Sequence, residues 1–498
     1  MGETKFLNLI HNLIHTLRQR LNTIFAITGI GLFSFIILIY TFVRMPNMIY
    51  AEVPITINLL FIATIGVIML GIHFLLNEGR GRLKEKNFLI GLIVFSFLLR
   101  LLWVMLVRTA PVSDYGSMHY LAASASEGEF TLKFGEGGYL YTFPHLVGNT
   151  LYLSILYRIF GVSLAIPKML NVVFSVITIV ILYFMTKKIF NEKSARIASF
   201  LYSIYSPTIM INSVLASENI AVPLFYLAFL MAILYHGEKG SKWYLWTIGP
   251  MMAMGHFMRP LAPIFLTAIV LYILFFEGDK GIDIKRNSKT IAIIGAGFMV
   301  VTLLINYSIV MLDIYEKPTW QEDVPYGKFL AGFNHASFGG FSMEDRMILE
   351  HHDFDYEKVN EEMKLRVEKR LEDPVAVISL MEKKYERIWV DNGFAFYWSL
   401  QHEQERVGLA ALLRDNTRNI RLLSQTFYMG ILAFAVAGCY YAMRVRKTYY
   451  HNLIIITFIG FVLIHCVTEV QSRYQQPAIP LFFIMGGYGI AKVYEAVK

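Results

Sequence analysis

The segment from Arg108 to Tyr120 combines groups that could perform acid–base chemistry at the edge of a membrane. It follows directly on an apolar run that ends at Val107. A carboxylate at the lip of a bilayer can act as a general base on a hydroxyl group that arrives from water. Asp114 could instead be the N-cap of a short helix that runs to Ala125, because aspartate is a favoured capping residue. The titratable side chains of the segment are Arg108, Asp114, Tyr115, His119 and Tyr120.

The composition identifies the class of protein. The chain has 498 residues, of which 56% are hydrophobic, 15% aromatic and only 16% charged. Long apolar runs recur along it, and a soluble protein of this size could not bury so much apolar surface. We therefore predict an all-α polytopic membrane protein. The formal net charge of +8 does not predict a nucleic-acid partner, because the basic residues cluster between apolar runs. Cys439 and Cys466 both lie in apolar runs, which is typical of small core residues.

The apolar runs predict about twelve transmembrane helices, several of them shorter than the ~20 residues that a straight span needs. Loops rich in lysine and arginine stay in the cytoplasm, which places both termini there. Residues 1–22, with apolar positions at helical spacing, predict an interfacial amphipathic helix. The predicted spans are Ile24–Val43, Ile55–Leu76, Phe88–Val107, Pro167–Met185, Ile197–Ser213, Ile220–Tyr235, Trp243–Met258, Leu261–Phe276, Ile291–Leu312, Thr426–Ala442, Leu453–Val467 and Ala478–Val493.

Two segments are predicted to lie outside the cytoplasm without spanning the membrane. If Leu146–Phe160 crossed the bilayer, the basic cluster that starts at Lys187 would fall on the outer side, so this run is predicted to be a juxtamembrane helix. Residues 313–425 are too long and polar for a connecting loop and predict a small helical extracytoplasmic domain. The predicted organisation is thus 1–22, 23–312 with an external catalytic loop at 108–163, 313–425, and the C-terminal helices at 426–498.

This topology brings five charged or titratable residues from distant parts of the chain to one membrane face. Two acids and two arginines that converge there predict a site for an anionic, membrane-embedded ligand, because the planar fork of arginine can bind two phosphate oxygens. Alternatively, each residue only marks the end of a span, where arginine and glutamate are ordinary interfacial residues. The five residues are Asp114, His145, Glu218, Arg259 and Arg473.

The order of several short motifs resembles the GT-C superfamily of membrane glycosyltransferases. The similarity is greatest to bacterial family 39, which includes protein mannosyltransferase-like and aminoarabinose-transferase-like enzymes. The resemblance implies an enzyme that moves a sugar from a polyprenyl-phosphate carrier to an acceptor hydroxyl on the extracytoplasmic face. The motifs are Asp114 after an early span, Phe143–Pro144, Gly161-Val-Ser before Lys168-Met-Leu-Asn171, Ser217–Glu218, Gly255-His-Phe-Met-Arg259-Pro260 and Arg473–Tyr474 before Pro477 and Pro480.

The resemblance also implies residue roles. Asp114 would be the catalytic carboxylate, and Arg259, with Arg473, would contact the carrier phosphate. Many relatives carry an acidic pair where this chain has Asp114 followed by Tyr115, so a divalent metal, which wants more oxygen ligands, is not predicted. No other cofactor is predicted, and the expected partners are the lipid-linked donor, a hydroxyl-bearing acceptor and the bilayer. The other expected cavity residues are Tyr115, Tyr120, His145, Glu218 and Tyr474.

Two rival functions share this topology. A transporter or flippase for a lipid-linked or anionic substrate would favour broken helices at matching places in two halves, and no such repeat is present. A polysaccharide polymerase or ligase would also act on lipid-linked sugars. In the external region, Lys328–Asn334 is predicted to lie near the acceptor, and Val375–Val390 to form an amphipathic helix on the membrane or over the active site. The acidic pair Asp353 and Asp355 is interpreted as an N-cap of the helix Tyr356–Leu371.

Overall fold

The chain folds entirely into helices and loops over the residues that the computed structural model describes, 2–44, 66, 68–73, 75, 83–135, 137–236, 241–277, 283–400, 409–445 and 448–498. This confirms the all-α class. The longer elements are α1 (Gly2–Ile39), α4 (Glu85–Leu106), α5 (Asp114–Glu127), α7 (Val147–Phe160), α8 (Ala165–Ile189), α9 (Glu192–Ile204), α11 (Glu218–His236), α12 (Lys242–Met258), α13 (Ala262–Phe276), α14 (Ile284–Met311), α16 (Met343–His351), α17 (Tyr356–Leu371), α18 (Pro374–Tyr385), α21 (Thr417–Ala442), α22 (His451–Val467) and α23 (Ile479–Val497). The shorter ones are η1 (Tyr40–Arg44), α6 (Tyr139–Thr142), η2 (Pro144–Leu146), α10 (Ser206–Met210), η3 (Ile211–Ser213), α15 (Gly327–Gly332), η4 (Glu386–Val390), α19 (Phe394–Leu400), α20 (Leu409–Asp415) and η5 (Ser472–Ala478).

Seven helical segments of the described chain are long and apolar enough to cross a membrane, and α13 and α22 are shorter apolar helices. The protein is therefore a multi-pass membrane protein. The count of twelve spans stays a prediction. The predicted span Ile55–Leu76 lies outside the described residues, apart from a few helical positions between 66 and 75. The seven segments are Asn12–Arg44, Glu85–Leu106, Ala165–Ile189, Glu218–His236, Ile284–Met311, Thr417–Ala442 and Ser472–Val497.

The predicted span Ile197–Ser213 is broken in the structure. Helix α9 ends at Ile204, and α10 begins at Ser206, with Pro207 in its first turn. Proline has no backbone N–H to donate to the Ser203 carbonyl four residues earlier, and its ring is not accommodated inside a helix, so α9 stops and α10 restarts with Pro207 in its first turn. Near the break lies Arg100 of α4, which is fully buried and donates to the Ser203 carbonyl at 3.0 Å. Arg100 therefore fastens α4 to the broken segment, which gives this intramembrane cation a structural role.

The main core joins α21, α23 and α9 to α11 and α22. Glycine allows α21 and α23 to approach closely: a Cβ on Gly489 would lie 1.8 Å from the Phe434 carbonyl oxygen. A Cβ on Gly438 would lie 2.2 Å from the Met485 carbonyl oxygen. Small residues at such crossings are typical of helix pairs in membranes.

Two predicted domain boundaries fall inside helices. The boundary at 22/23 lies within α1, which runs unbroken from Gly2 to Ile39, so the predicted amphipathic helix and the first span form one element. The boundary at 425/426 lies within α21, because that helix already begins at Thr417. The boundary at 312/313 coincides with the end of α14.

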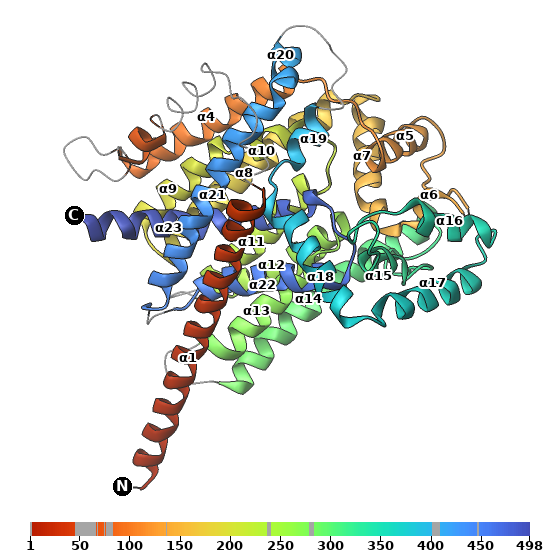
Figure 1. Cartoon of the computed structure of the whole chain (residues 1–498). Helices are drawn as coiled ribbons and strands as arrows, with labels where there is room; N and C mark the ends of the chain where they lie inside the picture. The colour runs from red at the N-terminus through yellow and green to blue at the C-terminus, as the bar shows by residue number, and fades with distance from the viewer. Residues whose placement is uncertain are drawn as a thin grey trace.

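The segment predicted as an extracytoplasmic domain, residues 313–425, includes a small core of its own, built by α15, α16, α17 and α18. Figure 1 shows α5, α6, α7 and α15–α17 gathered on one side of the bundle of long helices. The part of residues 313–425 that follows α18 packs elsewhere: Trp389 of η4 is 1% exposed and belongs to the main core. The expected N-cap is confirmed, since the Asp355 side chain accepts a hydrogen bond from the Lys358 backbone N–H. Helix α18 exposes Val375 and Ile378, as expected of an amphipathic helix.

Candidate active site

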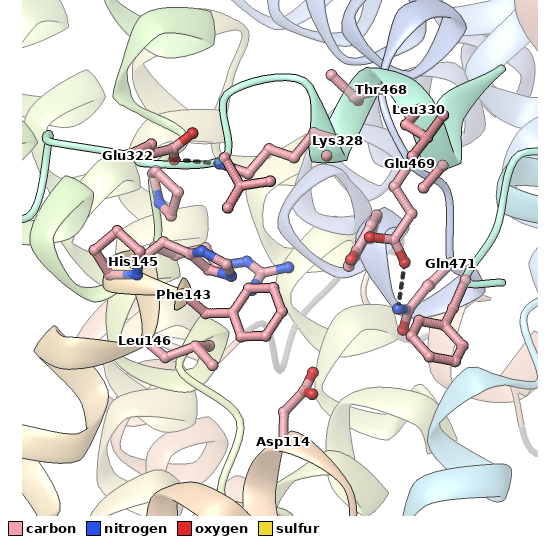
Figure 2. Close-up of a pocket in the computed structure, with 18 of the residues that line it drawn as sticks. Asp114, Phe143, His145, Leu146, Glu322, Lys328, Leu330, Thr468, Glu469 and Gln471 are labelled. Carbon is pink, nitrogen blue, oxygen red and sulfur yellow. Dashed lines mark hydrogen bonds and ion pairs between the residues drawn. The ribbon is translucent and has the colours of Figure 1, made fainter. Parts of the chain in front are cut away.

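A cavity of about 470 Å³ lies where the ends of several long helices meet residues 322–363. Figure 2 shows the carboxylate of Asp114 directed into it from below, with His145 at the left and Glu469 and Gln471 at the right. The five residues that the sequence placed at one membrane face all line this cavity. They are Asp114, His145, Glu218, Arg259 and Arg473.

Asp114 is the first residue of α5, and local backbone geometry directs its side chain. The residue before it, Ser113, occupies the N-cap position with φ 53°, a conformation that non-glycine residues rarely adopt. No side chain caps this helix end, and Asp114 is not the N-cap that the alternative interpretation required. A strained residue is maintained only where the surrounding structure enforces it, as at many functional sites.

The carboxylate of Asp114 accepts two hydrogen bonds. Arg473 Nη2 lies 2.7 Å from Oδ2, and the hydroxyl of Tyr139 lies 2.7 Å from Oδ1. Burial alone would raise the pKa of Asp114, but the charge and hydrogen bond of Arg473 and the bond from Tyr139 lower it below its ordinary value. Asp114 is therefore ionised at neutral pH. Its side chain remains 32% exposed to the cavity, and a carboxylate has lone pairs left for a further hydroxyl donor.

Arg473 is held in place by aromatic rings. It lies on the 3₁₀ helix η5, is 5% exposed, and its guanidinium carbon is 5.1 Å from the Tyr115 ring and 5.0 Å from the Trp398 ring. Such cation–π contacts fix the orientation of the guanidinium. Tyr115 is 4% exposed and lies behind Arg473 rather than on the cavity wall. Burial raises the pKa of Tyr115 to about 12, so this phenol stays protonated.

Arg259 is a second arginine that lines the cavity, beside Arg473. It follows the last residue of α12 and precedes Pro260, which forces the backbone out of helical geometry at Arg259. Its Nε lies 3.2 Å from Oε1 of Glu218, the 2%-exposed first residue of α11. The Tyr474 ring lies between the two arginines, 5.1 Å from the Arg259 guanidinium and 5.8 Å from that of Arg473. The two cations thus face one side of the cavity together.

His145 and Tyr120 occupy different environments. His145 lines the cavity, and burial, with the charges of Lys328 and Arg259, lowers its pKa well below the ordinary value. It is therefore a neutral hydrogen-bonding group at pH 7. Tyr120 is 69% exposed and does not line the cavity, so its expected place there is wrong. Tyr120 lies six positions after Asp114 in α5, an offset that turns the two side chains to different faces of the helix.

Several cavity residues were not singled out from the sequence. Tyr139 lacked a signal because nothing in the sequence of the short helix α6 indicates that it bonds Asp114. Glu469 lies four residues before Arg473 in the chain, and its carboxylate accepts a hydrogen bond of 2.8 Å from Gln471. Lys328, in the segment expected near the acceptor, pairs with Glu322 at 2.6 Å. Arg346, on α16, also lines the cavity.

Two carboxylates of the cavity, those of Asp114 and Glu218, each form an ion pair with an arginine. Asp114 binds Arg473, and Glu218 binds Arg259. Within the described ranges, no group of three or more histidine, cysteine, aspartate or glutamate side chains could hold a metal ion. The tyrosine after Asp114 also removes the oxygen ligand that an acidic pair would supply. The described residues of the cavity therefore do not fit a divalent-metal site.

Residues 148–307 match the family model of dolichyl-phosphate-mannose-protein mannosyltransferases. The match confirms the predicted GT-C resemblance. The matched segment begins in α7, ends in α14 and contains Glu218 and Arg259. Asp114 and Arg473 lie on either side of it in the chain and meet it at the cavity.

The chain is also similar to two solved structures of an oligosaccharyltransferase from Archaeoglobus fulgidus. One, AglB with an inhibitory peptide and a dolichol-phosphate, is 12% identical with a TM-score of 0.48. The other, the apo form, is 15% identical with a TM-score of 0.47. Each comparison covers 83% of this chain and 51% of the solved chain, so the chain spans about half the length of these structures. No curated protein matches the sequence.

Proposed function

We propose that the protein is an integral membrane glycosyltransferase that moves a sugar, a hexose or a pentose, from a polyprenyl-phosphate carrier to an acceptor hydroxyl outside the cytoplasm. The observation that carries the proposal is the cavity, where an ionised carboxylate and two arginines from distant parts of the chain face one another. The family match of residues 148–307 supports the same class of donor.

The proposed reaction is a displacement at the anomeric carbon. The acceptor hydroxyl transfers its proton to Asp114 as its oxygen bonds to the anomeric carbon. The bond from that carbon to the phosphate oxygen breaks, and polyprenyl phosphate leaves with the electron pair. Arg259 and Arg473 stabilise the negative charge that grows on the phosphate, because their orientation is fixed before the reaction.

Arg473 has a second part in this proposal. Its contact with Asp114 keeps the pKa of the carboxylate low, so the group is ionised before the substrate arrives. A donor phosphate near the two arginines would compete for the Arg473 guanidinium. The carboxylate would then be released to accept the proton of the acceptor, and donor binding would precede activation of the base.

Purified protein incubated with radiolabelled polyprenyl-phosphate sugars tests the function. We expect the donor to be consumed, polyprenyl phosphate to be released, and the sugar to appear on an acceptor or in water. A transporter would instead move intact donor between leaflets. Failure to consume any donor of a panel of hexoses and pentoses would contradict the transferase.

The proposed orientation places the cavity on the extracytoplasmic face. The choice of face rests on the lysine- and arginine-rich loops, which favour the cytoplasm. Two contacts support a single shared face: the Leu132 backbone N–H donates to the Ile314 carbonyl at 2.6 Å, and Asp114 binds Arg473. Residues in contact at a membrane face are separated by an even number of crossings. Between Leu132 and Ile314 we count six crossings, which is an even number. A crossing by α7 would make the number odd, so the contact supports a helix α7 that does not span. The six are α8, the broken α9–η3 segment, α11, α12, α13 and α14. Helix α7 has 14 residues, or about 21 Å, which is also short for a ~30 Å hydrocarbon core.

Accessibility labelling tests this orientation. A cysteine at the exposed positions Glu129 or Val375 should react with a membrane-impermeant thiol reagent on intact cells. A cysteine at the exposed Lys285 should react only after permeabilisation. The unaltered chain, with buried Cys439 and half-buried Cys466, gives the background. Labelling of Lys285→Cys on intact cells would contradict the orientation.

A further inference from the structure

Among the described residues, one cation of the cavity has no carboxylate partner. Four arginine and lysine side chains line the cavity, and three of them pair with a carboxylate: Arg473 with Asp114 at 2.7 Å, Arg259 with Glu218 at 3.2 Å and Lys328 with Glu322 at 2.6 Å. The fourth is Arg346. It makes no ion pair within the part of the chain that the structure describes. The acids that precede it in the chain bind other arginines: Glu344 binds Arg366, and Asp345 binds Arg370.

The described residues around Arg346 orient its guanidinium but leave one of its buried N–H groups without a hydrogen-bond acceptor. Its guanidinium carbon lies 5.5 Å from the centre of the Phe143 ring, a cation–π contact that orients it. Its Nε is buried, and no described residue accepts a hydrogen bond from it. A buried donor at a charged group is costly when it lacks a partner. An anion bound in the cavity would supply that partner.

Arg346 approaches the catalytic carboxylate from the side of the external region. The Phe143 ring under it packs on Tyr139 at 5.3 Å, and Tyr139 bonds Asp114. Arg473 bonds Oδ2 of Asp114, the oxygen that Tyr139 does not bond, and the Tyr474 ring lies between Arg473 and Arg259. In a displacement the entering oxygen and the leaving phosphate occupy opposite sides of the anomeric carbon. With the leaving phosphate at Arg259 and Arg473, the acceptor enters from the side of Arg346.

We propose that Arg346 is a specificity residue that binds an anionic group, a phosphate or a carboxylate, carried by the acceptor beside its reacting hydroxyl. This inference rests on the proposed function and names the substrate class of the same site. Arginine suits the role because its fork can bind two oxygens of either anion. A neutral acceptor would leave the Arg346 charge uncompensated as the cavity fills, whereas an anionic acceptor neutralises it.

A matched pair of small acceptors tests the inference. Glycerol and glycerol 3-phosphate both offer hydroxyl groups and differ in the phosphate. Each is added to wild-type protein in liposomes with a radiolabelled polyprenyl-phosphate sugar, and donor consumption is followed, hydrolysis included. We expect glycerol 3-phosphate to change donor consumption, by accepting the sugar or by competing with water, at concentrations where glycerol has no effect. In Arg346→Gln the concentration needed should rise by ~10–100-fold, the worth of a charge-assisted hydrogen bond.

Lys364→Gln is the matched control. It removes one positive charge from the exposed face of α17 in the same external region, outside the cavity, and should keep the wild-type response. An equal response of Lys364→Gln and Arg346→Gln would reduce the effect to general surface charge and overturn the inference.

Three further outcomes would overturn it while leaving the transferase intact. The first is a wild-type enzyme that consumes donor and responds equally to glycerol and glycerol 3-phosphate. The second is a response retained in Arg346→Gln, which would place the added phosphate at Arg259 and Arg473. The third is evidence that Arg346 binds an anion of the donor. Arg346→Gln would then weaken binding of polyprenyl phosphate as strongly as Arg259→Ala does, or it would impair only the transfer of acidic sugars. Absence of donor consumption by the wild type would contradict the proposed function itself.

Discussion

Asp114→Asn is expected to lower sugar transfer by ~10²–10⁴-fold, the usual contribution of a positioned general base. The substitution keeps the size of the side chain and removes its ability to take a proton. Its amide oxygen can still accept one hydrogen bond, from Arg473 or from Tyr139, while its NH₂ group faces the other donor. Transfer from a radiolabelled donor, measured at equal amounts of folded protein, gives the result.

Asp355→Asn is the matched control for this prediction. Asp355 is a true N-cap, and asparagine caps a helix as well as aspartate does, so transfer and stability should both be unchanged. Asp114→Glu should also be poor, because it moves the carboxylate by about 1 Å, and such displacements can cost ~10²-fold. Near-normal transfer by a folded Asp114→Asn variant would remove Asp114 from the mechanism.

Arg259→Ala is expected to weaken binding of polyprenyl phosphate by ~10–100-fold, since charge-assisted hydrogen bonds contribute about 1.5–3 kcal/mol. The physical reason is the loss of one of the two guanidinium groups that face the same side of the cavity. Arg259→Lys should recover part of the affinity, because it keeps the charge without the planar fork. Equilibrium binding of labelled polyprenyl phosphate to purified protein measures the effect.

Arg259→Ala also leaves Glu218 as a buried carboxylate without its cation, which is destabilising in its own right. The double variant Arg259→Ala with Glu218→Gln removes that penalty and should restore stability but not affinity. Wild-type affinity in the double variant would leave Arg259 as the structural partner of Glu218 alone.

The sequence by itself determined the class of protein and the place where the polar residues gather. Apolar run length and loop charge do not depend on which helix packs against which, so the runs around α4, α8, α11, α14 and α21 could be located from composition alone. The same topology predicted that Asp114, His145, Glu218, Arg259 and Arg473 would share one face, and all five line one cavity. A feature that depends only on neighbouring residues was also predicted: Asp355, directly before Tyr356, caps helix α17.

Only the tertiary structure decided which groups are partners. The Asp114–Arg473 and Glu218–Arg259 pairs join residues far apart in the chain, and their pairing depends on how helix ends meet, which no periodicity encodes. Tyr120 looked equivalent to Asp114 in the linear segment, yet the turn of α5 carries it to the exposed face. Arg346 gave no signal, because an arginine in a polar helix is ordinary until the neighbouring acids are seen to bind other arginines. The sequence shows which charged residues a site contains. Which of them neutralise one another depends on distances of a few ångströms, and packing sets those distances.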